Sequence, residues 1–278
     1  MKLRMLSSLK IYYFQIRALV IKDLKLKARY KIKFLFSMVF PITTFIMPLL
    51  IFRKLFEATG NESFGIWTPD NFIIFILSGI LFVILLKLFP AYGKNLLREK
   101  YWKTLPGVFL SPVNVFNLLV SKLLSELFIF LIPLIVAFIL CFIFSSASLF
   151  TIAFVFFIYL CASFFMASIG LAIGSFRMSK EGGYTVFSNL VGFFLIFSCY
   201  KYPREFFPDY LQFLIIWNPF YYYWDLIRVM LVFGAENIIF NPAYLLHFIV
   251  VLSLTIIAPI MSIMFFNYIY KKYGLVGY

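Results

Sequence analysis

Charged side chains inside or beside apolar runs are the residues of this sequence that could do chemistry. Lys122 and Glu126 lie four residues apart at the start of one apolar run, and Asp225 and Arg228 lie three apart within another. Residues at these spacings share one face of a helix, so each set can form an ion pair. We expect Asp225 and Arg228 to pair rather than to act as acid and base. Charges in membrane helices are usually functional. The alternative for the first set is a lysine that reaches the membrane surface beside Glu126.

The sequence offers little else for catalysis. Its one histidine, His247, follows Pro242 in an apolar run, and we interpret it as structural. The motifs H-E-x-x-H, G-x-S-x-G and Walker A are absent. Cys141, Cys161 and Cys199 lack metal-ligand spacing and are expected to be buried thiols. We therefore expect no catalytic residue, cofactor or metal on this chain, and any ATPase to be a separate chain.

The composition excludes a soluble domain. Of the 278 residues, 64% are hydrophobic, 22% aromatic and 13% charged. A soluble domain has roughly 25% charged residues, which this chain does not approach. The expected fold class is therefore an all-α integral membrane protein.

Six apolar runs have about the length needed to cross a bilayer. In order, they are residues 34–52, 72–86 with a continuation to 92, 123–144, 149–176, 184–200 and 243–270. A further stretch, 210–233, is interrupted by polar residues, and each half is too short to cross. We predict a re-entrant helix pair near 202–233, between the fifth and sixth spans, on the external side. The six-span domain then covers 34–278.

The distribution of positive charge predicts the orientation. Lysine and arginine number 25 against 11 aspartate and glutamate, a net charge of +14. In the six-span topology, 20 of the 25 lie on the side that carries both termini. Because positively charged loops stay cytoplasmic, we expect a multi-pass protein of the inner or plasma membrane with both termini in the cytoplasm. The charge then reports topology, and no nucleic-acid partner is expected.

The first 33 residues have a helical pattern of their own. Apolar residues recur at spacings of three or four: Leu6, Leu9, Tyr13, Ile16, Val20 and Leu24. Basic residues fall largely between them. This pattern predicts an amphipathic helix over 1–33 that lies in the inner interface among anionic lipid headgroups. The alternative is a solvated basic helix.

Three segments, taken in order, resemble a known family. They are residues 18–30 (ALVIKDLKLKARY), 97–113 (LREKYWKTLPGVFLSPV) and 207–228 (FPDYLQFLIIWNPFYYYWDLIR). Together with six spans, they resemble the permease subunits of ABC-2 type exporters, the transmembrane subunits of ATP-binding-cassette transporters, over nearly the whole chain. Two positions depart from the family pattern: Trp102 replaces a glycine, and Gly107 replaces a second glutamate.

The resemblance implies partners and a site of contact with them. Two cytoplasmic ATPase subunits, which hold ATP and Mg²⁺, would drive two copies of this chain or one copy and a paralogue. Residues 95–106 would form a coupling helix seated on the ATPase. The residues expected at this contact are Arg98, Glu99, Lys100, Tyr101 and Trp102. The alternative places this helix against headgroups, with Trp102 in the interfacial aromatic belt.

The predicted external hairpin would gate the exit. Its candidate residues are Asn218, Pro219, Tyr222, Asp225 and Arg228. Asn218 would cap a helix whose first residue is Pro219. Interfacial anchoring by residues 221–224 is the alternative.

Small and polar residues on the spans complete the expected site. The candidates for the substrate path are Ser78, Ser188, Asn189 and Ser198. Gly170 and Gly174 form a small-xxx-small pattern, which we expect to serve packing within the subunit.

These features predict the permease of an ATP-driven exporter that moves an amphipathic, lipid-linked or drug-like substrate outward. A polysaccharide or glycolipid substrate is the first alternative. An integral membrane enzyme or biogenesis factor, and then a channel or a structural protein, are alternatives of other classes.

Overall fold

The computed structural model describes residues 2–43, 50–51, 54, 56, 63, 65–103, 107, 114–145, 147–179 and 181–273. The elements of these ranges are helices. The first half contains α1 (Lys2–Ala28), α2 (Lys31–Thr43), α4 (Phe72–Leu86), α5 (Leu88–Tyr101), α7 (Val115–Ile129) and α8 (Leu131–Ser145). The second half contains α9 (Leu149–Ser179), α10 (Glu181–Ile196), η1 (Arg204–Phe206), α11 (Asp209–Ile216), α12 (Pro219–Phe233), α13 (Ala235–Ile239), η2 (Pro242–Tyr244) and α14 (Leu245–Tyr273).

Three apolar helices are long enough to cross a membrane. They are Phe72–Tyr101, which joins α4 and α5, Leu149–Phe176 and Pro242–Lys272. The pair α7 and α8 makes a fourth if it is one bent span. The fifth predicted run forms α10, whose apolar part, Thr185–Ile196, is shorter than a span. Residues 44–49 and 52 of the first predicted run lie outside the described residues. The chain is therefore a multi-pass membrane protein with three or four spans in its described part, and the count of six stays a prediction.

The third predicted run is not one straight helix. A bend of 67° separates α7 from α8. The turn falls at Phe130, three residues before Pro133. Pro133 has no N–H to donate to the carbonyl of Ile129, and its ring clashes with that carbonyl, so the helical hydrogen bonding is interrupted in the turn before it. The predicted span over 123–144 is therefore bent, and it stays a prediction that the two helices cross the membrane as one span.

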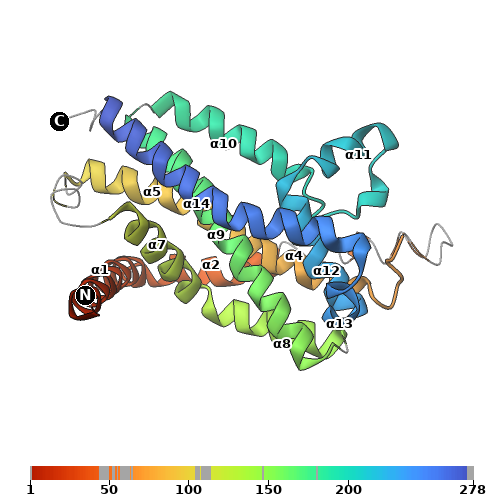
Figure 1. Ribbon diagram of the computed structural model, residues 1–278. Helices are drawn as coiled ribbons and strands as arrows, with labels where there is room; N and C mark the ends of the chain where they lie inside the picture. Colours follow the sequence, from red (N-terminus) through yellow and green to blue (C-terminus); the bar gives the residue numbers. More distant parts are fainter. Residues whose placement is uncertain are drawn as a thin grey trace.

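Helix α9 lies at the centre of the bundle, against α5, α10, α12 and α14 (Figure 1). Its two glycines face α5. A Cβ atom at Gly170 would lie 2.9 Å from the carbonyl oxygen of Phe89, and one at Gly174 would lie 3.2 Å from the amide nitrogen of Gly93. The expected packing of these glycines within the subunit is confirmed.

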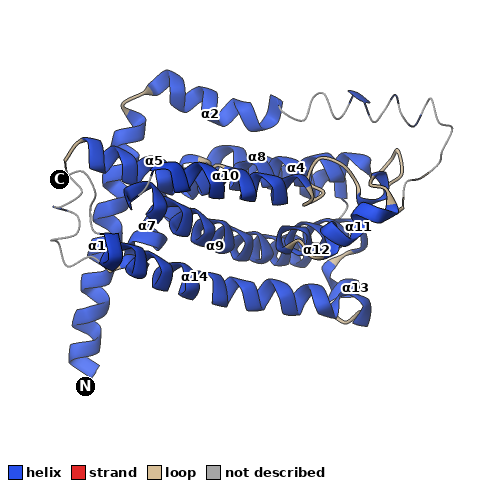
Figure 2. Ribbon diagram, turned by 90° about the horizontal axis from the view of Figure 1, so that it is seen from above, coloured by secondary structure: helices blue, strands red, loops and turns tan. Residues whose placement is uncertain are grey.

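The bundle has two distinct ends. We call the end with α1, the C-terminal end of α5 and that of α14 the basic end, and the end with α11, α12 and α13 the hairpin end (Figure 1). Helix α1 runs across the basic end instead of along the bundle (Figure 2). The amino terminus and the last turn of α14 share this end, as the predicted topology requires. Which side of the membrane it faces, and the interfacial position of α1, stay predictions.

Candidate functional site

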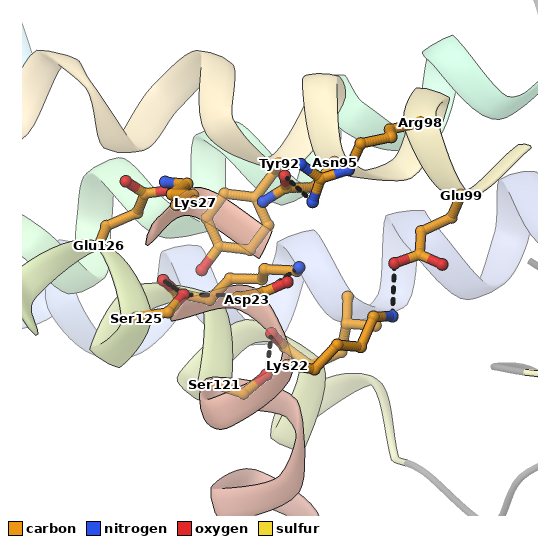
Figure 3. A network of polar contacts seen from close by, with 12 residues as sticks. Lys22, Asp23, Lys27, Tyr92, Asn95, Arg98, Glu99, Ser121, Ser125 and Glu126 are labelled. Atoms are coloured by element: carbon orange, nitrogen blue, oxygen red, sulfur yellow. Dashed lines mark hydrogen bonds and ion pairs between the residues drawn. The ribbon is translucent and has the colours of Figure 1, made fainter. Parts of the chain in front are cut away.

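Three ion pairs fasten α1 to the bundle at the basic end. Asp23 pairs with Lys122 and Lys27 pairs with Glu126, both on α7, and Lys22 pairs with Glu99 on α5 (Figure 3). We call these six residues the polar junction. Asp23 and Lys122 are only 1% and 5% exposed, so this pair is withdrawn from solvent. A buried charge is costly without a partner, and here each partner comes from another helix.

Lys122 neither pairs with Glu126 nor reaches the membrane surface beside it, since it is buried and pairs with Asp23. Both residues instead bind partners on α1 that lie 99 residues away in sequence. Asp23 and Lys27 are four residues apart on α1, as Lys122 and Glu126 are on α7, so the two helix faces match in spacing and opposite charge. The sequence holds one signal that could have predicted a partner on α1 for a buried lysine. Asp23 is the only acidic residue among the first 56 residues.

Neutral hydrogen bonds reinforce the polar junction. The Asn117 side chain donates to Gln15 Oε1 on α1 over 2.6 Å. The fully buried Tyr92 hydroxyl on α5 donates to the carbonyl of Leu119 on α7 over 2.6 Å. Ser125 Oγ lies 3.5 Å from the Asp23 carboxylate. Helices α1, α5 and α7 therefore form one connected unit.

The predicted coupling residues lie at the C-terminal end of α5. Residues 95–101 continue the long helix from α4 and are not a separate short helix, while 104–106 lie outside the described residues. Glu99 points inward to Lys22 and is buried. Arg98 lies over the Trp102 ring at 5.2 Å, and Tyr101 and Trp102 are 67% and 51% exposed.

Lys100, the remaining member of that set, is half-buried on the same turn of α5. The two aromatic rings are thus the most exposed part of the predicted contact. They lie at the C-terminal end of α5, which the ion pair between Glu99 and Lys22 joins to α1.

Helix α12 at the hairpin end begins as its sequence predicts. Asn218 Oδ1 accepts from the amide of Phe220 at 3.1 Å, and Pro219 is the first helical residue. The other side of the Asn218 amide donates to the carbonyl of Phe194 on α10 over 2.6 Å. The predicted cap is confirmed. Tyr222 adds a hydrogen bond from its hydroxyl to the carbonyl of Ile216, which joins α12 to α11.

Helix α12 packs inside the bundle against α4, α9 and α14. Its residues 221–224 are buried, with exposed fractions between 1% and 8%. These aromatic side chains face other helices, so within this chain they do not form a surface belt.

The side chain of Arg228 is held by several groups inside the protein. It is 3% exposed, and its guanidinium donates to Ser78 Oγ at 3.0 Å and to the carbonyls of Cys199 at 2.6 Å and Tyr200 at 3.0 Å. The guanidinium also lies 3.8 Å from the centroid of the Phe75 ring. We call Arg228 with these four partners the arginine cluster.

The expected ion pair between Asp225 and Arg228 does not form. Asp225 lies 3.0 Å from His247 Nε2 on α14, which brings together two residues that are distant in sequence. Arg228 turns instead to the carbonyls after α10, where Cys199 has a φ of +57°. A non-glycine residue seldom adopts this conformation, so the chain turn there needs support from its surroundings. Arg228 supplies that support.

A second polar contact at the hairpin end joins α13 to the start of α9. Thr151 Oγ1 accepts from the amide of Ala235 at 2.9 Å and donates to Glu236 at 3.0 Å. Ser148 also donates to the Glu236 carboxylate. These hydroxyl donors, Ser148 first, lower the pKa of Glu236 below its ordinary value by stabilising the carboxylate.

Comparison of the sequence with known families decides the class of protein. A family model described as ABC-2 type transporter matches residues 14–232, which include both the polar junction and Arg228. The chain belongs to the ABC-2 type transporter family. A search of curated proteins gave no match. This family comprises the membrane component of ABC transporters, so the chain is a transmembrane permease, and its family implies an ABC ATPase as a partner.

The four polar residues predicted to line the path of this ABC-2 permease differ in their surroundings. Ser78 is fully buried and belongs to the arginine cluster. Ser198 is also fully buried, and its hydroxyl donates to the carbonyl of Leu195. Ser188 is half-buried and Asn189 is exposed on α10. Only α10 therefore presents these candidates at the surface of the single chain.

Proposed function

We propose that this permease exports an amphipathic, lipid-linked or drug-like substrate, driven by separate ATPase subunits that bind at the tip of α5. Two copies of the chain, or one copy and a paralogue, would enclose the path, with both termini in the cytoplasm. The observation that carries this proposal is the pair of exposed rings, Tyr101 and Trp102, at the end of a helix tied to α1 and α7. Large aromatic residues are typical of the most strongly binding positions of protein interfaces.

The long helix Phe72–Tyr101 supports a route for the motion. Its 30 residues correspond to about 45 Å at 1.5 Å per residue. One end carries Trp102, and the other holds Ser78 and Phe75 in the arginine cluster. A displacement of the α5 tip by the ATPase would therefore reach the hairpin end through one helix. The polar junction would make α1 and α7 move with it.

Co-purification of the full-length permease with its ATPase tests this proposal. The double variant Arg98→Glu with Trp102→Ala is expected to lose the complex, and with it the permease-dependent part of ATP hydrolysis. The matched control is Trp217→Ala, since Trp217 is 81% exposed at the hairpin end. The control is expected to keep the complex and the rate. An unchanged complex and ATPase rate in the double variant would reject the contact at α5.

A further inference from the structure

A cavity of about 480 Å³ opens beside the polar junction at the basic end. One part of its wall is basic, with Lys27, Lys87, Lys94 and Arg98. Its lining also includes the apolar side chains of Ile129 and Phe130 at the bend between α7 and α8. The cavity therefore combines a cluster of cations with a hydrocarbon surface.

The cations of this cavity outnumber the acids. Glu126 is the only acid among the lining residues, and it pairs with Lys27. Within the described ranges, Lys87, Lys94 and Arg98 have no carboxylate partner. Lys87 lies 4.4 Å from the centroid of the Phe40 ring, and Arg98 lies over Trp102. Three positive charges are thus left for an anion.

Two buried N–H donors of residues that line the cavity also lack an acceptor in the described part of the chain. Asn95 is 5% exposed, and its Oδ1 accepts from Arg98 Nη2 at 3.0 Å. Among the described residues, its Nδ2 has no hydrogen-bond partner, and neither has the buried Nε of Arg98; Figure 3 shows the two side chains next to each other. A buried donor left without an acceptor is costly and uncommon in native proteins. The described residues do not supply an acceptor for these donors, and the cavity that Asn95 and Arg98 line has room for one from another molecule.

We infer that this cavity binds the phosphate of an anionic phospholipid, with the acyl chain along Ile129 and Phe130. A phosphate diester offers the charge and the several acceptor oxygens that the cations and the two orphan donors require. Basic pockets between membrane helices are suited to such headgroups. A free phosphate ion would satisfy the donors but would leave the apolar wall unused. The assignment concerns a bound lipid and does not depend on the direction or substrate of transport.

Native mass spectrometry of the full-length permease tests the site. The protein is taken from bilayers of phosphatidylcholine and phosphatidylglycerol, and the retained lipids are counted. The wild type is expected to retain phosphatidylglycerol in preference to phosphatidylcholine. The double variant Lys87→Gln with Lys94→Gln is expected to lower that preference about tenfold, because it removes two charge-assisted contacts. Arg98 is kept intact, so a failed ATPase contact and a failed lipid site are told apart.

Two further variants separate a site from general surface charge. Lys10→Gln with Lys25→Gln removes the same charge from exposed positions of α1 outside the cavity, and it is expected to keep the preference. Lys87→Arg with Lys94→Arg keeps the charge and is expected to retain the lipid, which covers the case in which the glutamine variant unfolds. An equal loss in the exposed control, or full retention in the glutamine variant, would overturn the inference. Displacement of the lipid by inorganic phosphate would overturn it in favour of a free anion.

Discussion

The polar junction and the arginine cluster bury charge in different ways. At the polar junction, each charge meets an opposite charge on a side chain of another helix. In the arginine cluster, a single charge is held by a neutral hydroxyl, two backbone carbonyls and the face of a ring. Two paired side chains can both be replaced by mutation. A backbone carbonyl cannot be removed by mutation, because every residue type has one. Loss of one charge at the polar junction can therefore be compensated by replacing its partner. Loss of Arg228 cannot be compensated by replacing one of its partners.

The largest effect is expected at the most buried ion pair. Lys122→Met leaves the Asp23 carboxylate buried without its cation, which should lower the free energy of unfolding by about 3–5 kcal/mol. Asp23→Leu combined with Lys122→Met removes both charges and should restore most of that stability. Reversible unfolding of the purified chain in one detergent, followed by circular dichroism, measures both variants.

The control for these two variants is the more exposed ion pair of Lys22 with Glu99. Lys22→Met acts on a lysine that keeps 37% of its side-chain surface and should cost less than Lys122→Met, but more than the roughly 1 kcal/mol of a fully exposed pair, because Glu99 stays buried without its cation. A double variant no more stable than Lys122→Met would contradict pairwise compensation at the polar junction.

A substitution in the arginine cluster is expected to lower the free energy of unfolding by less, and a second substitution is not expected to restore it. Arg228→Met leaves the carbonyls of Cys199 and Tyr200 buried without donors, which should cost about 2–4 kcal/mol. Adding Ser78→Ala should recover little, because the two carbonyls stay unsatisfied. The same unfolding measurement applies.

Arg204→Met is the matched control at the hairpin end, since Arg204 is half-buried and its guanidinium donates to the Gln212 side chain instead of to main-chain carbonyls. Equal losses in the two arginine variants would remove the distinction drawn for Arg228. A recovery with Ser78→Ala as large as that at the polar junction would do the same.

The contact of α9 with α5 involves glycines instead of charged residues. Gly170→Ala places a methyl group 2.9 Å from the carbonyl oxygen of Phe89 and should cost about 1–3 kcal/mol through forced separation of the helices. Gly192→Ala on α10 is the control, because its Cβ would meet no atom within 4 Å. The midpoint of thermal unfolding should fall for the first variant and stay the same or rise for the second. Equal midpoints would show that α5 and α9 can separate without cost.

Features that depend on a short stretch of chain could be predicted. The runs 149–176 and 243–270 correspond closely to α9 and α14, since a span requires about 20 apolar residues in sequence. The cap at Asn218 was predictable because its donor lies two residues away. The break before Pro133 had a signal as well, but the apolar composition of the run concealed it. The three segments that resemble the family lead to the class that the family model confirms.

The partners of the charged residues could not be predicted in this way. Helical spacing suggested Glu126 for Lys122 and Asp225 for Arg228, yet the structure pairs Lys122 with Asp23 and gives Arg228 the carbonyls of Cys199 and Tyr200. Spacing along one helix identifies which side chains share a face, and it carries no information about which other helix covers that face. Composition thus decides that this chain is a bundle of membrane helices. The crossing of those helices decides where each buried charge finds its partner, because a charge in a medium of low dielectric constant must be paired wherever the packing leaves it.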